Sequence, residues 1–321
     1  MGNTMHNSVG PVATSLSRPA SRTDPARVTP SSIAALLMVR NEEHIVATCI
    51  GHLLNTVRVD RIYVTDNGSV DGTPDILRRL ASRTNRVVVT SDSGDFRQGE
   101  IITALAHRAA ADGFAWLLPT DADEFLWLRP GHSLAALCGR ESIGGYRLDL
   151  CNFLQARPIR RDWPGALGLM AVAAIPTGTM ATDEAAVSTG TLPFIRITYP
   201  TKILVRATPA LTIAFGNHDA AGTAGPLVPL PEAEILHAPL RAFDRLHRRA
   251  EAGRRSYVTT PEPGQSWHIK RIAEMDTAAL EQEWRHNSFS LLHPVKKGET
   301  RLDLRLTKVS RQQAAFRRSL L

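Results

Sequence analysis

Residues 114–128 read Phe-Ala-Trp-Leu-Leu-Pro-Thr-Asp-Ala-Asp-Glu-Phe-Leu-Trp-Leu, so that an acidic cluster at 121–124 lies between two apolar runs. The first run has the length of an interior strand buried on both faces, where an ionised carboxylate is strongly disfavoured. Asp121, Asp123 and Glu124 are therefore expected where this strand emerges. Because residues i and i+2 of an extended segment point to the same side, Asp121 and Asp123 can address one Mg²⁺ or Mn²⁺ ion. The alternative interpretation is a solvated acidic turn.

Strand and helix patterns alternate four times before residue 121. Apolar runs at 33–39, 61–66, 86–90 and 114–120 predict strands, and the segments between them carry helical patterns and short turns. Alternation of this kind is typical of an α/β fold with a doubly wound, mostly parallel sheet flanked by helices. Further strands predicted at 146–153 and 201–206 would make the sheet mixed.

Polar side chains follow each of the four predicted strands. In a parallel sheet ligands bind beyond the carboxyl ends of the strands, so these groups are expected to share one site. In chain order they are Asn41 and Glu42, Asp66 and Asp71, Arg97 and Gln98, and the acidic cluster. Asn41 is also expected to cap the helix that follows it.

The second half of the chain offers weaker signals. Residues 163–193, rich in Ala, Gly, Thr and Pro, predict a mobile loop. His218 and His237 are candidate ligands, although a single histidine is more often structural. An arginine-rich helix is predicted over 239–252. We expect it to be a solvated helix covering the core, with phosphate or peripheral membrane contact as the alternative.

The composition describes an ordinary globular protein of 321 residues with a net charge of +7. The charge suits an anionic ligand or surface. No aromatic-basic or zinc motif accompanies it, so no nucleic-acid partner is expected. Three cysteines without a C-x-x-C pair indicate a reduced, cytoplasmic location. No apolar segment approaches the roughly 20 residues of a transmembrane helix.

The pattern also predicts a division of the chain. Residues 1–32 are rich in Ser, Pro, Thr and Arg and are expected to be a disordered leader. A catalytic domain is expected over 33–265, with a nucleotide-binding half at 33–130 and an acceptor half at 131–265. Residues 266–321 are expected to form a helical C-terminal extension.

Three motifs in order carry a resemblance to a known family. Val39-Arg40-Asn41-Glu42-Glu43, the segment 64–73 (Val-Thr-Asp-Asn-Gly-Ser-Val-Asp-Gly-Thr) and Asp121-Ala122-Asp123-Glu124-Phe125 resemble the family 2 glycosyltransferases of GT-A fold. The last motif is similar to the Asp-x-Asp-Glu-Phe metal box of a bacterial branch. The resemblance covers about residues 33–130, and it departs from the family at Asn67, where many members carry a second aspartate.

The resemblance implies a nucleotide-sugar donor, a UDP-sugar by expectation, and Mn²⁺ or Mg²⁺ as cofactor. Asn41, Glu42 and Asp66 would hold the nucleoside, Asp71 would support that loop, and Arg97 or Gln98 would reach the donor. Asp121 and Asp123 would bind the metal, with Asp121 also on the donor's ribose and diphosphate. His237 is the candidate third metal ligand, with His218 as the alternative.

Transfer with inversion needs one carboxylate as base. In the family that the sequence resembles, this base follows the metal box, and Asp219 occupies a comparable region of this chain, with Asp149 as the alternative. The acceptor is left open between a small molecule, a lipid-linked group and a polysaccharide. Three alternatives compete with transfer. A nucleotidyltransferase is disfavoured because Arg40-Asn41-Glu42-Glu43 replaces the glycine-rich basic loop, and an inactive scaffold because Asp121 and Asp123 are both present. An oxidoreductase is disfavoured by the lack of Gly-x-Gly-x-x-Gly.

Overall fold

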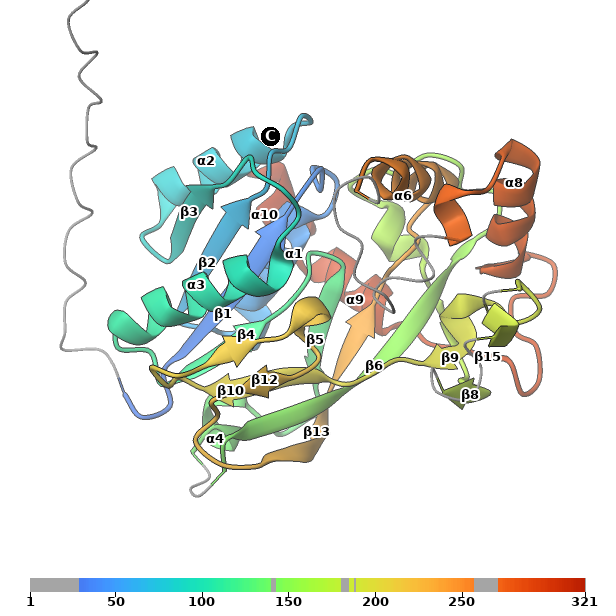
Figure 1. Ribbon diagram of the computed structural model, residues 1–321. Coiled ribbons are helices and arrows are strands. Elements are labelled where there is room, and N and C mark those ends of the chain that lie inside the picture. The colour runs from blue at the N-terminus through green and yellow to red at the C-terminus, as the bar shows by residue number, and fades with distance from the viewer. Residues whose placement is uncertain (1–28, 140–142, 180–184, 188, 257–270, 321) are drawn as a thin grey trace, which may run out of the picture.

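The computed structural model describes residues 29–139, 143–179, 185–187, 189–256 and 271–320 (Figure 1). The first half alternates strands and helices. In chain order these are β1 (Ile33–Val39), α1 (Val46–His52) with the π-turn η2 (Leu53–Val57), β2 (Arg61–Asp66), α2 (Thr73–Arg83), β3 (Val87–Ser91), α3 (Gln98–Ala111), β4 (Trp116–Pro119), β5 (Glu124–Leu128) and α4 (Leu134–Leu137).

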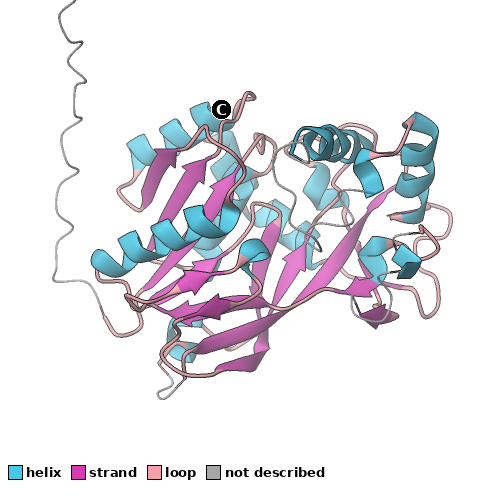
Figure 2. Ribbon diagram, viewed as in Figure 1, coloured by secondary structure: helices cyan, strands magenta, loops and turns pink. Residues whose placement is uncertain are grey.

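The second half consists mainly of strands (Figure 2). It contains β6 (Gly145–Ala156), η3 (Ala166–Leu169), β7 (Val172–Ala174), β8 (Gly178–Thr179), η4 (Phe194–Arg196), β9 (Ile197–Thr198), β10 (Lys202–Arg206), β11 (Thr212–Ile213), η5 (Phe215–Asn217), β12 (Ala220–Ala221) and β13 (Leu227–His237). It continues with α6 (Phe243–Ser256), α8 (Thr277–His286), β14 (Ser288–Phe289), β15 (Thr300–Leu302), α9 (Arg305–Gln312) and α10 (Ala314–Arg318).

One large sheet organises the described residues, with strand order β15-β7-β6-β10-β4-β1-β2-β3. Strands β1, β2, β3 and β4 are mutually parallel, and β10 is antiparallel to both β4 and β6. Strand β13 pairs in parallel with β6 and antiparallel with β5. The predicted mixed, mostly parallel sheet flanked by helices is therefore confirmed.

Successive side chains of β1 point to opposite faces of the sheet, and both faces are covered by helices, which explains why its seven residues are all apolar. Ile33, Ala35 and Leu37 pack with α1 and α2 on one face of the sheet, whereas Ala34 and Leu36 pack with α3 on the other. A strand with helices on both faces needs apolar residues at every position. The carboxyl end of β1 thus opens between two helical layers.

Both the first half of the chain and the segment after residue 266 contribute strands that pair with the strands of the large sheet. The leader prediction lies outside the described residues except for 29–32. Besides α8, α9 and α10, the segment after 266 contributes β14 and β15, which pair with β6 and β7, so it is not purely helical. The prediction of a mobile loop at 163–193 is wrong for residues 166–174, because η3 and β7 bury most of their side chains.

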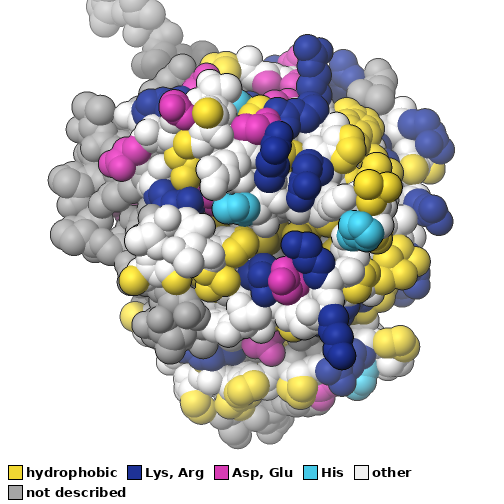
Figure 3. All heavy atoms as spheres, turned by 90° about the vertical axis from the view of Figure 1, so that its right-hand side faces the viewer, with side chains coloured by type: hydrophobic (Ala, Val, Ile, Leu, Met, Phe, Trp, Pro, Cys, Tyr) yellow, Lys and Arg dark blue, Asp and Glu magenta, His cyan; other side chains and the backbone are white. Residues whose placement is uncertain are grey.

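The side of the molecule beyond β6 carries α8 and the segment between β14 and β15. Figure 3 shows that Lys and Arg side chains are interspersed with hydrophobic ones on this face. A second apolar cluster lies beneath it and includes Phe194, Leu246 and Trp284, contributed by η4, α6 and α8.

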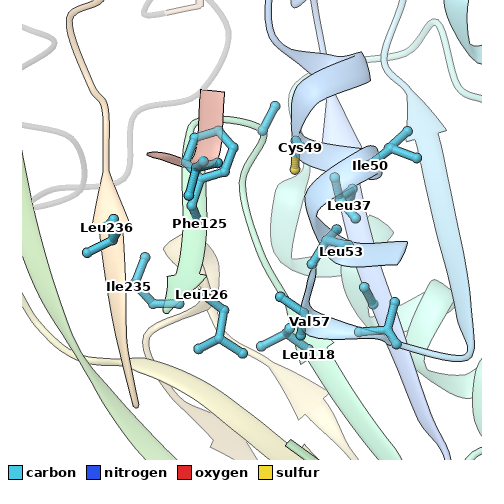
Figure 4. Close-up of a cluster of buried hydrophobic side chains, with 14 of the residues drawn as sticks. Leu37, Cys49, Ile50, Leu53, Val57, Leu118, Phe125, Leu126, Ile235 and Leu236 are labelled. Atoms are coloured by element: carbon cyan, nitrogen blue, oxygen red, sulfur yellow. The ribbon is translucent and has the colours of Figure 1, made fainter. Parts of the chain in front are cut away.

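The main core joins the two halves of the chain. Figure 4 shows Cys49, Leu53 and Val57 of α1 and η2 facing Phe125 and Leu126 of β5, with Ile235 and Leu236 of β13 on the other side of β5. Asp121 and Asp123 lie in the connection between β4 and β5, and Glu124 is the first residue of β5; both strands are anchored in this core. Packing on both sides of the connection therefore fixes where its carboxylates point.

Candidate active site

The carboxyl ends of β1, β2 and β4 meet the end of β13 at one edge of the sheet. His237, the last residue of β13, is paired with Glu124 of β5 on one side and with Asn152 of β6 on the other. The backbone N–H of Ala238 donates to the carbonyl of Asp123 at 2.9 Å. The predicted acidic cluster and His237 are therefore brought together.

Asp121 is held by three side chains. Its Oδ1 accepts hydrogen bonds from Gln98 Nε2 at 2.8 Å and from Asn217 Nδ2 at 3.3 Å. Its Oδ2 lies 2.9 Å from the ammonium of Lys202. Gln98 also accepts from the backbone N–H of Gly216 at 3.1 Å, so it links Asp121 to the turn at 215–217.

Lys202 and Glu124 form a buried ion pair beneath Asp121. The ammonium lies 2.7 Å from Glu124 Oε1, and both side chains are almost fully buried. Burial lowers the pKa of Lys202, but the carboxylates of Asp121 and Glu124 outweigh it and hold that pKa above its usual value. Burial raises the pKa of Glu124, and Lys202 opposes this shift. Lys202 thus supplies a fixed positive charge under the cluster.

Asp123 faces a different set of groups. Its Oδ2 lies 3.8 Å from His237 Nε2 and 3.4 Å from Arg249 Nη2. Burial raises the pKa of Asp123, but His237, Arg249 and other arginines outweigh that effect, and the pKa lies below its usual range. Asp123 is therefore an ionised carboxylate.

His237 has the neutral imidazole that a metal ligand requires. Burial lowers its pKa to about 4, an effect that Asp123 only partly offsets, so the imidazole is neutral near pH 7. Its Nδ1 lies 2.8 Å from Asn152 Oδ1, which can only accept, so Nδ1 carries the proton. The lone pair of Nε2 is consequently on the Asp123 side. Within the described residues, no three His, Cys, Asp or Glu side chains converge to hold a metal ion.

The loops after β1 and β2 form the neighbouring part of the site. Asn41 has a positive φ of 56°, and its Oδ1 accepts from the backbone N–H of Val70 at 2.8 Å. The prediction that Asn41 caps α1 is wrong, since α1 begins at Val46 without a side-chain cap. Asp66 Oδ1 accepts from both the hydroxyl and the N–H of Ser69.

Asp71 and Asn67 stabilise the same loop. Asp71 accepts from the backbone N–H of Thr73 at 2.9 Å and of Glu43 at 3.2 Å. Asn67 is 1% exposed and donates from Nδ2 to the carbonyls of Asp92 and Gly94. An aspartate at 67 could not donate these two bonds, which gives a structural reason for Asn67.

A family model now adds to this geometry. Residues 35–127 match the model described as glycosyl transferase family 2. The match to the family 2 glycosyltransferases covers this segment of the chain. The match spans the strands β1 to β4 and the acidic cluster, which are the elements that build the edge described above.

Solved structures similar to this chain share little of its sequence. The mannosyltransferase PcManGT from Pyrobaculum calidifontis, in complex with GDP-Man and Mn²⁺, is 12% identical with a TM-score of 0.40, covering 81% of this chain and 76% of that one. TarS 1–349 from S. aureus is 11% identical with a TM-score of 0.34, covering 75% and 69%.

Glucosyl-3-phosphoglycerate synthase from Mycobacterium tuberculosis, in complex with Mn²⁺, UDP and glucosyl-3-phosphoglycerate, is 19% identical with a TM-score of 0.33, covering 77% and 81%. With TM-scores below 0.5, these likenesses carry no argument about the site. No curated protein matches the sequence.

The carboxylate of Glu42 is bound by two arginines at and just before the start of α6. Arg241 and Arg245 both contact it, and Arg241 also contacts Asp162 at 2.9 Å. Arg241 is 1% exposed and Arg245 is 7% exposed. The prediction of a solvated arginine-rich helix is therefore wrong for these residues, because Glu42 and Asp162 provide buried partners that the helical pattern alone does not show.

Two other predicted site residues form ion pairs outside the acidic cluster. Arg97 is half exposed and pairs with Asp92 and Glu100. Asp219 is largely exposed and pairs with Arg147 at 3.0 Å. Both side chains are thus accessible and already paired with a charge of the chain.

Among the described residues, no hydrogen bond or ion pair joins Asp149 or His218 to Asp123 or His237. Asp149 is exposed on β6, opposite Glu234 and three residues before Asn152. His218 Nδ1 lies 3.2 Å from the carbonyl of Thr201, and burial lowers its pKa to about 4. His237, rather than His218, is the histidine beside Asp123.

The structure adds Lys202, Asn217, Asn152 and Arg249 to the predicted residues. Each reaches the acidic cluster or His237 from a strand, turn or helix far away in the sequence. A lysine at the start of the apolar strand 202–206 is the one local signal, because a lysine there is buried only if it is paired. In the described part of the chain, no helix is both long and apolar enough to cross a membrane.

Proposed function

We propose that this glycosyltransferase is metal-dependent and transfers a sugar from a nucleotide-sugar donor, by preference a UDP-sugar, to an acceptor with inversion. The observation that carries the proposal is the pair formed by the ionised carboxylate of Asp123 and the neutral imidazole of His237. The pair lies at the strand edge of the segment that matches the family.

The donor atoms of this pair fit a divalent cation. Two ligands on one ion lie at most about 4.2 Å apart, twice a metal–ligand distance of about 2.1 Å. The separation of Asp123 Oδ2 and His237 Nε2 is 3.8 Å, within that limit. A hydrogen bond that fixes the other ring nitrogen, as Asn152 provides, is the usual support of a histidine ligand. The mixed oxygen and nitrogen set favours Mn²⁺ over Mg²⁺.

Asp121 is proposed as the further ligand and as a contact of the donor's ribose and diphosphate. Its two oxygens already accept bonds from Gln98, Asn217 and Lys202. A carboxylate has about four lone-pair sites, so Asp121 keeps acceptor capacity. Lys202 and Gln98 would therefore position Asp121, rather than reach the donor themselves.

The nucleoside would lie against the loops after β1 and β2. Asp66 uses Oδ1 for Ser69, and the described residues donate no hydrogen bond to its Oδ2. That oxygen is available for an N–H group of the base. We propose that Asn41, Glu42 and Asp71 maintain the shape of this wall, because each bonds to another loop or helix of the site. Arg97 would approach the donor.

The metal, when bound, would neutralise charge on the departing diphosphate. Arg249, whose guanidinium already lies beside Asp123, can add a second positive charge there. A carboxylate must also take the acceptor's proton. We propose Asp219 for this role because it follows the 215–217 turn that contacts Asp121 and because its carboxylate is accessible; Asp149 is the second candidate.

The acceptor would bind to the half of the domain formed by residues 131–265, and the C-terminal segment 266–321 would support that half. A cytoplasmic location agrees with three free, buried cysteines. One observation favours the competing idea of an inactive scaffold. Asp121 and Asp123 each meet a cation of the chain, Lys202 and Arg249, so the cluster is charge-compensated without a metal.

Calorimetric binding of UDP-, GDP- and dTDP-sugars with Mn²⁺, with Mg²⁺ or with EDTA separates these functions. We expect one donor to bind only with metal, and Asp123→Ala and His237→Ala each to abolish that binding. Asp75→Ala, which removes an exposed carboxylate of α2, is the control and should bind normally. Donor binding that ignores both EDTA and Asp123→Ala, or no binding at all, would leave the scaffold as the better description.

A further inference from the structure

The connection between β14 and β15 exposes large apolar side chains at its tip. Leu291 is 63% exposed, Leu292 is 85% exposed and Val295 is 47% exposed. Isolated apolar residues are common on protein surfaces, but three within five residues form a local concentration. We propose that this loop, residues 290–299, docks the protein on an anionic lipid bilayer.

The loop is anchored at both ends, so its tip is presented in a fixed place. Ser288 and Phe289 of β14 pair with β6, and β15 pairs with β7. Inside the loop the N–H of Lys296 donates to Thr300 Oγ1 at 2.9 Å, and the N–H of Glu299 donates to the carbonyl of Lys296 at 2.9 Å. Because these bonds order the loop, its leucines are not exposed by fraying.

Further exposed leucines adjoin the loop at its C-terminal side. Leu302 is 63% exposed on β15, and Leu304 is 56% exposed just after it. The N–H of Asp303, between them, donates to the carbonyl of Ala171 at 2.9 Å, which ties this stretch to the end of η3. The face turned toward the viewer in Figure 3 includes this part of the molecule, where hydrophobic and basic side chains alternate.

The charges beside the leucines select an anionic surface. Lys296 and Lys297 follow Val295 directly, and both are exposed. Glu299 lies 3.1 Å from Arg196 and 3.8 Å from Lys296, and Asp303 lies 2.7 Å from Arg305. Because Arg196 and Arg305 compensate these two carboxylates, the lysines leave this surface with a net positive charge. Apolar side chains at the tip with lysines just behind them match the headgroup region of a bilayer, in which leucines enter the acyl boundary and ammonium groups meet anionic lipids.

This surface differs from the arginine-rich helix at 239–252, for which membrane contact was the alternative to a solvated helix over the core. Arg241 and Arg245 are buried against Glu42 and Asp162, so they cannot meet lipid. Lys296 and Lys297 of the loop 290–299, by contrast, are both exposed.

The loop lies near the candidate active site. β14 pairs with Gln155 and Ala156 of β6, three to four residues beyond Asn152, the partner of His237. At about 3.3 Å per residue, this places the base of the loop roughly 10–13 Å from Asn152. If the proposed transfer is correct, docking would bring the site within reach of an acceptor carried by the bilayer; the docking itself does not depend on that transfer.

Vesicle co-sedimentation tests the docking directly. We expect the full chain to bind vesicles of phosphatidylcholine mixed with phosphatidylglycerol and to bind phosphatidylcholine alone much less. Leu291→Ser/Leu292→Ser should weaken binding to the mixed vesicles by about tenfold or more, because burying one leucine is worth at least the roughly 1.4 kcal/mol of a tenfold change. Leu291→Ile/Leu292→Ile should bind as the unmodified chain does.

The charge is tested by Lys296→Ser/Lys297→Ser, which should remove the preference for anionic vesicles and its salt dependence. Lys308→Ser, an exposed lysine of α9, is the matched control and should leave the preference intact. Gel filtration of each variant without lipid measures its oligomeric state.

The proposal is overturned if the unmodified chain binds neither kind of vesicle or binds both equally. It is also overturned if the leucine substitutions convert an oligomer to a monomer without altering vesicle binding, since a second copy would then cover the loop. Calorimetry with a nucleotide sugar, performed in parallel, distinguishes failure of docking from failure of the proposed transfer.

Discussion

Removing the amide of Asn152 should weaken metal binding although Asn152 is not proposed as a ligand. Asn152 is 5% exposed, and its Oδ1 lies 2.8 Å from His237 Nδ1. In Asn152→Ala the imidazole loses the acceptor that fixes its tautomer and its ring orientation. Losing such a partner typically costs 10- to 100-fold in metal affinity, or about 1.4–2.8 kcal/mol.

The assay is calorimetric titration of Mn²⁺ with a nucleoside diphosphate present. His237→Ala sets the lower limit, and Asn152→Asp, which keeps an acceptor beside Nδ1, should recover most of the affinity. Asn287→Ala is the matched control, because Asn287 is also a buried amide and also contacts Ile195, but the structure gives it no contact with His237 among the described residues.

The reasoning is refuted if Asn152→Ala binds Mn²⁺ as tightly as the unmodified protein while His237→Ala does not. Equal losses in Asn152→Ala and Asn287→Ala would also refute it, since a general loosening of this region would then explain both. A loss confined to Asn152→Ala, with recovery by aspartate, is the expected result.

Three further predictions concern stability, measured by urea unfolding. Arg241→Met should destabilise the fold by about 3–5 kcal/mol because the buried carboxylate of Asp162 loses the guanidinium that lies 2.9 Å away. Arg248→Met, at a partly exposed surface pair, should change stability by less than about 1 kcal/mol; similar losses in both would contradict the buried network. Lys202→Met should cost a comparable amount, about 3–5 kcal/mol, and adding Glu124→Gln should return part of it, since the second change removes the unpaired buried charge; no recovery would count against the ion pair. Burial lowers the pKa of His52 to about 4, whereas its pKa in the unfolded chain is about 6.5. Between these two values only the unfolded chain takes up the proton, so the fold becomes less stable as the pH decreases from 6.5. Relative to the unmodified chain, His52→Leu should lose about 2 kcal/mol less between pH 7 and pH 5, and an unchanged pH dependence would show that His52 titrates normally.

Much of the fold is contained in local patterns of the sequence. The run at 33–39 has apolar residues at every position because helices cover both faces of β1, and such a run predicts a central parallel strand. The acidic cluster is predictable for the same reason, since carboxylates cannot continue the buried run that precedes them. Strand β5 was not predicted, because the run 125–128 reads equally well as part of a loop or a helix.

The partners of the site residues could not be predicted in the same way. Lys202 meets Asp121 across 81 residues, and Arg245 meets Glu42 across 203. Such pairs depend on how β10 and α6 pack against the first half of the sheet, and no local periodicity encodes that packing. His237 was predicted beside the acidic cluster from the family resemblance, whereas its hydrogen bond to Asn152 follows only from the register of β13 on β6.

The packing of α10 against α1 has a consequence for synthesis. Arg317 donates to Thr48 Oγ1 over a separation of 269 residues, and Gln313 contacts Thr56 near the end of η2. At roughly 5–20 residues per second, a ribosome needs about 13–54 s to translate that interval. Throughout this time the nascent α1 lacks its covering helix, so its outer surface is open to chaperones until α10 has emerged. Slowing translation late in the message should therefore lengthen chaperone association, whereas slowing it before β1 should not.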